Sequence, residues 1–480
     1  MSDMIDLVAR LRAYEAGHAI RCATHLQVAI QPHALIIVPL AMAGEDTFLH
    51  GIAVGTIGGP PEVRIIPDPR VRDEQYALIE WVGAIVERYY AERRARGEFP
   101  QMWVSSEAAA GQLDILADRL RFTRDASAIK RTGDLLTYVT ERRPIAGQQA
   151  LITATGALSL HYATGQQRAE DEHLGTFLTW LDPPQGIDIR RAVERAEREV
   201  MGVKTDPEFD RRELAPLISA FNRARKAQAS ERELEQRRAA IETRLQPIIG
   251  TIYAAVQRAL GFLQGQFPPA GILANLTAHE ADEFASFMTA RDGGMPLPYR
   301  DTPKAGAFKI SARELAIQNA DADAVYGDTM AQARARLEGR ILTGRTENAS
   351  IIKAGRKKLH RFDVESAQTN LHLRAGDKLA LLANSGLCCV VEGVRRSDAA
   401  TRVSLLVVKG MNSVGMPLDG TAVDFTPPRA EWDQLIRLRG KMSKRLAATP
   451  WTHADNVPVA GAASSIAKPS DLLAAVEALR

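Results

Sequence analysis

The stretch from Ile352 to Phe425 constrains the fold of this chain more than any other part of the sequence. It contains short apolar runs that alternate with turn-forming residues such as Asn384, Gly386 and Gly415. Short runs with frequent turns are typical of a small, strongly bent sheet or barrel. We therefore predict a small β-barrel here. The runs expected to form its strands are Leu379–Leu382, Cys389–Val394, Val403–Val408 and Thr421–Phe425.

A basic run lies at the start of this stretch and leads into the predicted strands. A cationic segment beside a barrel can neutralise the phosphates of a nucleic acid, and such contacts carry affinity rather than base sequence. The alternative interpretation is a solvated connector. The residues predicted to bind nucleic acid are Lys353, Arg356, Lys357, Lys358 and Arg361, with Arg395 and Arg396 as secondary members.

The turn placement of this predicted barrel resembles the accessory barrel of superfamily-1 helicases related to the nonsense-mediated-decay helicase. The resemblance is carried by Gly376 and Asp377 before the first expected strand, and by Gly410. It covers under a sixth of the chain. The motor motifs of that family are missing, so the resemblance implies a barrel and not a helicase activity.

Composition places the chain among ordinary globular proteins and excludes a global polycation. A length of 480 residues predicts two to four domains, and the formal charge is only +3. Three cysteines form no disulfide framework, which fits a reducing cytoplasm. The N-terminus is acidic where a signal peptide would be basic, and polar residues interrupt the apolar window from Ala23 to Gly44, so no membrane helix is expected. Abundant alanine and arginine suggest a bacterial source.

The first quarter of the chain shows three strands, a helix, a strand and a helix. This order resembles the start of ribonuclease-H-like domains, which hydrolyse phosphodiesters with metal-binding carboxylates on their first and fourth strands. The predicted strands are Ala34–Leu40, Gly51–Thr56, Val63–Ile66 and Met102–Ser105, and the helices are Asp73–Arg96 and Glu107–Phe122.

The carboxylates that this resemblance requires are missing. The strand Ala34–Leu40 contains no acid, and the fourth strand ends with Ser105 and Ser106 before Glu107. The resemblance therefore implies a degenerate, structural ribonuclease-H-like domain. An unrelated α/β sandwich is the alternative.

The middle of the chain favours helix almost throughout. Between Ser230 and Gln246, Glu and Arg alternate densely at helical i,i+4 spacing, which is typical of a solvated or coiled helix. Gly and Pro in Asp292–Lys309 indicate a loop. The expected helices are Leu135–Arg143, Gln148–Gln166, Glu170–Leu181, Ile189–Val200, Arg212–Gln266 and Ser311–Gly339, the last capped by Ser311.

We therefore predict a multidomain α+β protein with four parts. These are an α/β domain over residues 1–125, a helical domain over 126–350, the barrel with its basic lead-in over 351–428, and a basic helix with a C-terminal arm over 429–480. Within the last part, the expected segments are a helix Glu431–Arg445, an irregular arm Thr449–Ser465 and a helix Ser470–Leu479.

The function favoured by the sequence is a non-catalytic, nucleic-acid-binding or nucleic-acid-processing accessory protein of the cytoplasm. We expect no catalytic residue, no metal and no cofactor, because no nucleotide-binding loop, nucleophile elbow or metal-ligand spacing is complete. One alternative is a scaffold or assembly subunit that uses its charged helices for a protein partner or for self-association. A second is a metal-dependent hydrolase with a site built from Glu107, Asp114, His161 and His173.

Overall fold

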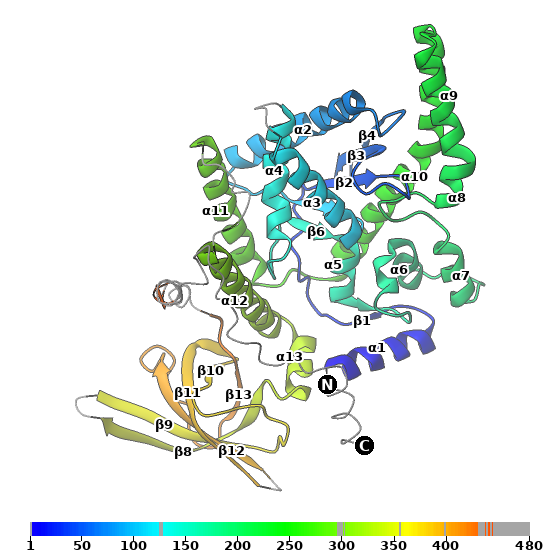
Figure 1. Ribbon diagram of the computed structural model, residues 1–480. Coiled ribbons are helices and arrows are strands. Elements are labelled where there is room, and N and C mark those ends of the chain that lie inside the picture. The colour runs from blue at the N-terminus through cyan, green and yellow to red at the C-terminus, as the bar shows by residue number, and fades with distance from the viewer. Residues whose placement is uncertain are drawn as a thin grey trace, which may run out of the picture. The chain divides into compact units, whose positions relative to one another are not determined.

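The structure is a computed structural model that describes residues 2–123, 128–294, 301, 303–354, 357–397 and 400–430, and the single residues 437, 440, 441 and 444. Side chains are not described at positions 2, 3, 303, 304, 353, 354 and 357. The chain divides into two compact units, residues 1–297 with 316–429 and residues 298–315 with 430–480. The first unit holds a five-stranded sheet, a two-stranded sheet and a closed barrel (Figure 1).

The protein is a mixed α/β chain in which helix predominates. The helices are α1 Ser2–Ala16, α2 Arg72–Ala95, α3 Glu107–Arg121, α4 Ala128–Arg142, α5 Ala154–His161, α6 Leu174–Leu181, α7 Ile189–Ala196, α8 Pro207–Phe209, α9 Ala215–Lys226, α10 Glu231–Gln266, α11 Leu273–Asp292, α12 Pro303–Gly327 and α13 Thr329–Leu337. The strands are β1 Ile20–Arg21, β2 Leu35–Leu40, β3 Gly51–Thr56, β4 Glu62–Ile65, β5 Met102–Val104, β6 Leu151–Thr153, β7 Tyr162–Ala163, β8 Leu342–Ala354, β9 Lys357–Ser366, β10 Lys378–Leu381, β11 Asn384–Arg396, β12 Thr401–Lys409 and β13 Ala422–Thr426.

The N-terminal sheet has five strands in the order β4-β3-β2-β5-β6. Strands β2, β3 and β4 form an antiparallel meander, and β5 and β6 continue the sheet in parallel with β2. Pro39 is tolerated in the central strand β2 because β5 pairs with β2 only at Leu35 and Ile36. The missing N–H of Pro39 therefore interrupts no rung of the β2–β5 ladder.

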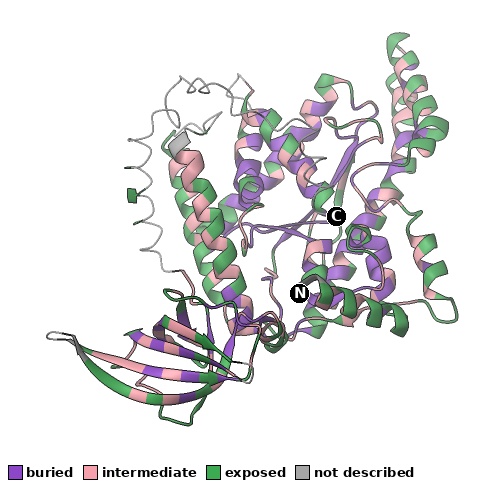
Figure 2. Ribbon diagram, turned by 60° about the horizontal axis from the view of Figure 1, so that its bottom comes forward, coloured by how far each residue is buried: buried purple, intermediate pink, exposed green. Residues whose placement is uncertain are grey.

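Strand β2 is buried on both faces, which explains its uninterrupted apolar sequence. Because strand residues alternate between faces, Ile36 and Val38 join one core, and Leu35 and Ile37 join the other. Helices α5, α6 and α10 contribute to the first core, and α2, α3, α4 and α11 contribute to the second. Figure 2 shows this sheet buried between helices.

The four strands and two helices predicted between residues 34 and 122 are confirmed to within a few residues, whereas the helix expected over Gln148–Gln166 is wrong in part. Residues Leu151–Thr153 form β6, and the helix α5 covers only Ala154–His161. The strand was missed because it is three residues long and is stabilised by pairing with β5, a contact that local propensity does not contain.

The single helix expected over Arg212–Gln266 is also wrong. It is divided into α9 and α10 around residues 227–230, where Gln228 adopts a positive φ of 53°. The Ser230 side chain accepts a hydrogen bond from the Glu233 N–H and caps α10. Farther on, Ser311 is not a helix cap, since α12 begins at Pro303.

The barrel is confirmed as a closed sheet in the order β10-β11-β12-β9-β8-β13. All four runs that were expected to be strands are strands. Its interior is filled by one apolar cluster, in which the rings of Phe362 and Phe425 lie 5.9 Å apart between centroids. Pairing of β13 with both β8 and β10 closes the sheet and leaves no free edge within the barrel.

Two barrel strands, β8 and β9, were not predicted from the sequence. Strand β8 has the polar sequence Thr-Gly-Arg-Thr-Glu-Asn-Ala-Ser over 343–350, so it has no apolar run to recognise. Strand β9 alternates buried Phe362 and Val364 with the charged Asp363 and Glu365, a period of two that is typical of a half-buried strand.

The predicted helix Glu431–Arg445, arm Thr449–Ser465 and helix Ser470–Leu479 lie outside the described residues, apart from helical positions at 437, 440, 441 and 444. Among the helices that the structure describes, none combines the length and the apolar character needed to cross a bilayer.

Candidate nucleic-acid interface

The basic run lies in the β8–β9 hairpin of the barrel, in a part of the hairpin that extends beyond the neighbouring strands. Strand β13 pairs with β8 from Leu342 to Arg345, and β12 pairs with β9 from Arg361 to Ser366. Past these positions, among the described residues, β8 and β9 pair only with each other. We call residues 350–354 and 357–361 the ribbon, and Figure 1 shows this hairpin reaching past the rest of the barrel.

The ribbon has five rungs in regular antiparallel register. They join Ser350 to Arg361, Ile351 to His360, Ile352 to Leu359, Lys353 to Lys358, and Ala354 to Lys357. A β-bulge between Glu347 and Ser350 precedes them, with Asn348 at a positive φ of 56°. Bulges increase local twist and bend a strand. The bulge therefore separates the ribbon from the part of β8 that closes the barrel.

The structure places four of the five primary basic residues on the ribbon. Lys353 and Lys357 are on its last two rungs, and Lys358 is exposed on β9. Arg361 is at the base of the ribbon and forms an ion pair with Glu392, with 2.7 Å between Nε and Oε2. Arg356 lies outside the described residues.

The two secondary residues are not brought to the ribbon. Arg395 and Arg396 are the last two residues of β11. Because β12 pairs with both β11 and β9, the registers place these arginines near Ser366, at the opposite end of β9 from Lys357. Nine residue steps along β9 separate these ends, about 30 Å at the usual rise. Arg396 also donates a hydrogen bond of 3.0 Å to the Leu371 carbonyl, so part of its role is structural.

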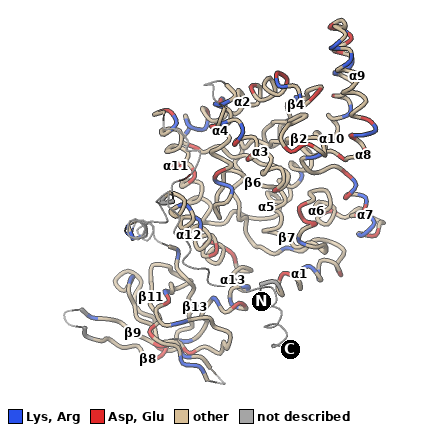
Figure 3. Tube along the Cα trace, viewed as in Figure 1, with Lys and Arg blue, Asp and Glu red and all other residues tan. Residues whose placement is uncertain are grey.

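Charge is distributed unevenly between the ribbon and the rest of the barrel. Residues 342–426 contain 12 Lys or Arg and 8 Asp or Glu, a net +4 that exceeds the +3 of the whole chain. Segment 350–361 contains five of these cations and no acid. Figure 3 shows acidic and basic residues mixed along the barrel. There, Arg402 pairs with Glu347 at 3.1 Å and with Glu365 at 3.7 Å.

Two exposed isoleucines on the ribbon were missed by the sequence analysis. Ile351 is 56% exposed and Ile352 is 40% exposed. Adjacent residues of a strand point to opposite faces, so each face of the ribbon carries one of them. The available signal was the pair Ile351–Ile352 directly before Lys353, in a segment with no other apolar run.

The residues suggested for a hydrolase are engaged in structural contacts. The buried His161 imidazole donates from Nδ1 to the Ala157 carbonyl and accepts at Nε2 from the Gln27 N–H, at 2.6 and 2.9 Å, and burial lowers its pKa. His173 caps α6 by accepting from the Thr176 N–H. Among the described residues, no three His, Cys, Asp or Glu side chains gather as a metal site.

Glu107 and Asp114, the other two residues of that alternative, lie on α3. The Glu107 carboxylate accepts from Arg143 Nε at 2.9 Å and from the Thr153 hydroxyl at 3.3 Å. Burial raises the pKa of Asp114, and the nearby Asp118 raises it further. A raised pKa favours the neutral acid, which is a poorer metal ligand than the carboxylate.

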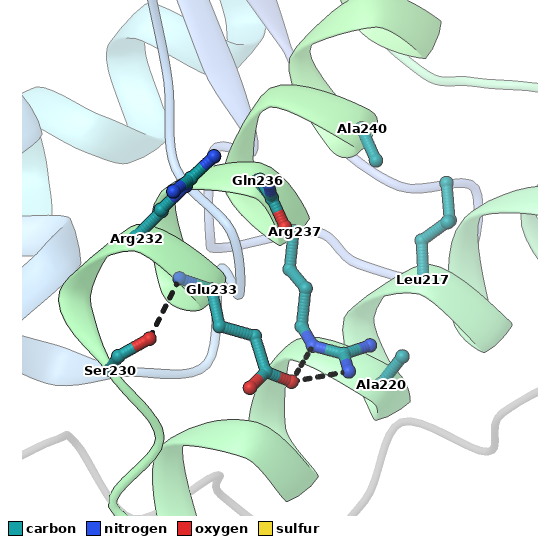
Figure 4. A pocket seen from close by; sticks show the side chains of 8 residues that line it. All are labelled: Leu217, Ala220, Ser230, Arg232, Glu233, Gln236, Arg237 and Ala240. Carbon is teal, nitrogen blue, oxygen red and sulfur yellow. Dashed lines mark hydrogen bonds and ion pairs between the residues drawn. The ribbon is translucent and has the colours of Figure 1, made fainter.

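A shallow pocket of about 500 Å³ lies where α9 faces the start of α10. Figure 4 shows Glu233 and Arg237 inside it, joined by an ion pair of 2.6 Å. This pair confirms one i,i+4 contact expected in the Glu/Arg-rich segment. The other lining residues are Leu217, Ala220, Ser230, Arg232, Gln236 and Ala240.

The pocket has no group arranged for catalysis. Its ion pair, Glu233 with Arg237, is partly exposed, and exposed i,i+4 pairs stabilise a helix by only about 0.3–0.5 kcal/mol. The pocket therefore adds no second site to the ribbon.

Neither a protein-family model, nor a curated protein, nor a solved structure matches this chain.

Proposed function

We propose that the protein is a non-catalytic nucleic-acid-binding accessory protein that contacts phosphates through the ribbon of its C-terminal barrel. The observation that carries this proposal is the concentration of five Lys or Arg, with no acid, in segment 350–361 of a hairpin that extends beyond the barrel. A projecting cationic ribbon can approach a phosphate backbone without a clash from the rest of the barrel.

The proposal assigns a structural role to the N-terminal domain. Strands β2 and β5, which correspond to the first and fourth strands of the ribonuclease-H-like order, are parallel neighbours in the sheet. This adjacency supports the proposed likeness. The sequence of β2 is Leu-Ile-Ile-Val-Pro-Leu, and Ser105 and Ser106 follow β5, so the strands lack the acids that metal-dependent cleavage uses.

The proposal is tested by replacing Lys357, Lys358 and Arg361 together by Ala in the full chain. Binding to duplex DNA is measured by fluorescence anisotropy over a range of salt concentrations. Each lost phosphate contact lowers the log–log salt slope by roughly 0.9, so the two lysines lower it by roughly 1.8 and Arg361, which is paired with Glu392, adds a smaller decrease. The loss should be similar on unrelated base sequences.

A matched variant controls for the change in net charge. Arg374, Lys378 and Lys409 lie on the same barrel but outside the ribbon, and their joint replacement by Ala removes the same formal charge. It should retain the parental salt slope. If the two triple variants lose affinity equally, or if neither differs from the parent, the ribbon is a solvated hairpin and the proposal is wrong.

A scaffold function is a second candidate, favoured by an apolar stripe on α1. Five large side chains at heptad-like spacing form this stripe, and at least 42% of the surface of each is exposed. They are Met4, Leu7, Val8, Leu11 and Tyr14. The opposite side of the helix is anchored by an ion pair of 2.7 Å between Arg10 and the buried Asp171. Light scattering after nuclease treatment distinguishes the candidates, because assembly that survives without nucleic acid supports the scaffold.

A further inference from the structure

We infer that the ribbon binds double-stranded B-form DNA by entering its major groove, with the face of Ile351 and Lys358 toward the base edges. This inference rests on the proposed function and names its substrate class. The first observation is geometric. The ribbon is a two-stranded element of five rungs, of which only the first, at Arg361, is also paired with β12, and the major groove of B-DNA is wide enough to admit such a ribbon.

The length of the ribbon is sufficient for this insertion. Five residues of antiparallel strand extend roughly 17 Å, whereas the major groove of B-DNA is roughly 8.5 Å deep. The ribbon is longer than the groove is deep, so it can lie along the groove with one face toward the base edges while the closed barrel remains outside the phosphate backbones.

The two faces of the ribbon are chemically different, and this difference selects the one that faces the bases. By register, Ile352, Lys357, Leu359 and Arg361 share one face, on which Arg361 is held by Glu392 of the barrel. Ile351, Lys358 and His360 share the other face, where Ile351 and Lys358 are exposed. A free ammonium beside a free apolar group suits a groove with guanine acceptors and thymine methyl groups.

Other forms of nucleic acid fit this surface less well. The major groove of A-form RNA is deep and narrow, so side chains cannot read it. Single strands are bound mainly by stacking of bases on aromatic rings, and segment 350–361 contains no Phe, Tyr or Trp. An acidic protein partner would neutralise the cations. It would not, however, offer a groove that matches the dimensions of the ribbon, as the major groove of B-DNA does.

The first experiment compares ligands with the full-length protein at one salt concentration. The probes are a duplex DNA of about two helical turns, roughly 21 base pairs, the duplex RNA of the same sequence, and each single strand. We expect the DNA duplex to bind most tightly. Methyl green, a major-groove ligand, should compete with the protein, and netropsin, a minor-groove ligand, should not.

The second experiment tests the apolar contact. Ile351→Ser should weaken binding to the DNA duplex by about tenfold, because the substitution removes apolar surface that becomes buried when the ribbon enters the groove. The matched control is Leu418→Ser, which changes a 79% exposed leucine outside the ribbon and should bind as the parent does. Replacing thymine by uracil throughout the duplex should weaken parental binding by about two- to fourfold and should leave the Ile351→Ser variant unaffected.

The outcomes separate the two proposals. Equal binding of DNA and RNA duplexes, competition by netropsin rather than methyl green, or an unaffected Ile351→Ser variant would overturn the groove assignment while leaving nucleic-acid binding intact. Absence of binding to every nucleic acid would overturn the proposed function itself, and binding of an acidic peptide alone would point to a protein partner. Circular dichroism of both serine variants verifies that a loss of binding does not reflect unfolding.

Discussion

Arg361 on β9 and Glu392 on β11 form an ion pair that spans the intervening strand β12, with 2.7 Å between Nε and Oε2. The register of β11 shifts between Val391 and Gly393, so Glu392 is the extra residue of a β-bulge. Bulges redirect side chains. As a result, one cation of the basic run is neutralised by the barrel, whereas Lys358 on the same strand is exposed.

This difference predicts unequal effects of single substitutions in the ribbon. Lys358→Ala should lower the log–log salt slope for duplex DNA by roughly 0.9. Arg361→Ala should lower it by less, because the guanidinium is already paired with a carboxylate. Glu392→Gln should raise the affinity by freeing Arg361. Anisotropy titrations over a salt series measure all three, and an Arg361 effect equal to that of Lys358 would contradict the role of the pair.

The buried pair of Arg142 and Glu280 should be essential for stability. Glu280 is 2% exposed, and its Oε2 lies 2.6 Å from Arg142 Nε, which joins α4 to α11. Glu280→Ala leaves a buried cation without its main partner, so we expect a loss of about 3–5 kcal/mol in the free energy of unfolding. Urea denaturation followed by circular dichroism measures this loss.

Glu283→Ala is the matched control for that substitution. Glu283 lies on the same helix and contacts the same arginine at 3.2 Å, but 44% of its side chain is exposed. An exposed pair contributes about 0–1 kcal/mol. Similar losses in the two variants would show that burial is not what gives Glu280 its importance.

The close crossing of α3 and α4 predicts a large effect of one added methyl group. A Cβ at Gly133 would lie 2.6 Å from the Cβ of Leu120, and the backbone of Arg121 is also within contact. Gly133→Ala should therefore destabilise the protein by about 1–3 kcal/mol.

The control for this prediction is Gly111→Ala in α3. There, the nearest atom to the added Cβ is an Arg143 guanidinium nitrogen at 3.8 Å, an ordinary contact. Alanine is the better helix former, so this variant should be more stable by about 0.5–1 kcal/mol. Thermal unfolding of both variants provides the comparison, and a stabilised Gly133→Ala variant would refute the proposed tight crossing.

His50 predicts a loss of stability in mild acid. Burial lowers the pKa of His50 from 6.5 to about 4, and nearby Asp68 opposes this shift in part. Between these values the unfolded chain binds a proton that the folded chain does not, so stability falls as the pH drops from 6.5 to about 4. The full effect is about 3 kcal/mol.

Urea denaturation at pH 7 and pH 5 measures the His50 effect. His50→Gln removes the titrating group and should lose less stability over this interval than the parent. His33→Gln, at an exposed position, is the matched control and should retain the parental loss. A parental loss that persists unchanged in His50→Gln would assign the acid sensitivity to other groups.

Local patterns in the sequence determined much of the secondary structure. The apolar run Leu35–Leu40 indicates a buried strand, because a strand that is buried on both faces consists of apolar residues throughout. The spacing of Leu78, Val82 and Val86 indicates the buried face of α2, because a helix that is buried on one side has apolar residues three or four positions apart. The four barrel strands β10–β13 were predicted for the same reason. The cationic run 353–361 was also apparent, since charge is a property of the sequence itself.

Only the tertiary structure decided which segments meet and which charges are free. Strand β6 is only three residues long and β8 has no apolar run over 343–350, and both are strands because β5, β9 and β13 supply their hydrogen-bond partners. Register placed Lys353 opposite Lys358 on a projecting ribbon, and a bulge at Glu392 brought a carboxylate to Arg361. These are long-range pairings, and a one-residue shift would move every side chain of a strand to its other face. The sequence thus determined the charge of the candidate interface, and the fold determined its shape and its free groups.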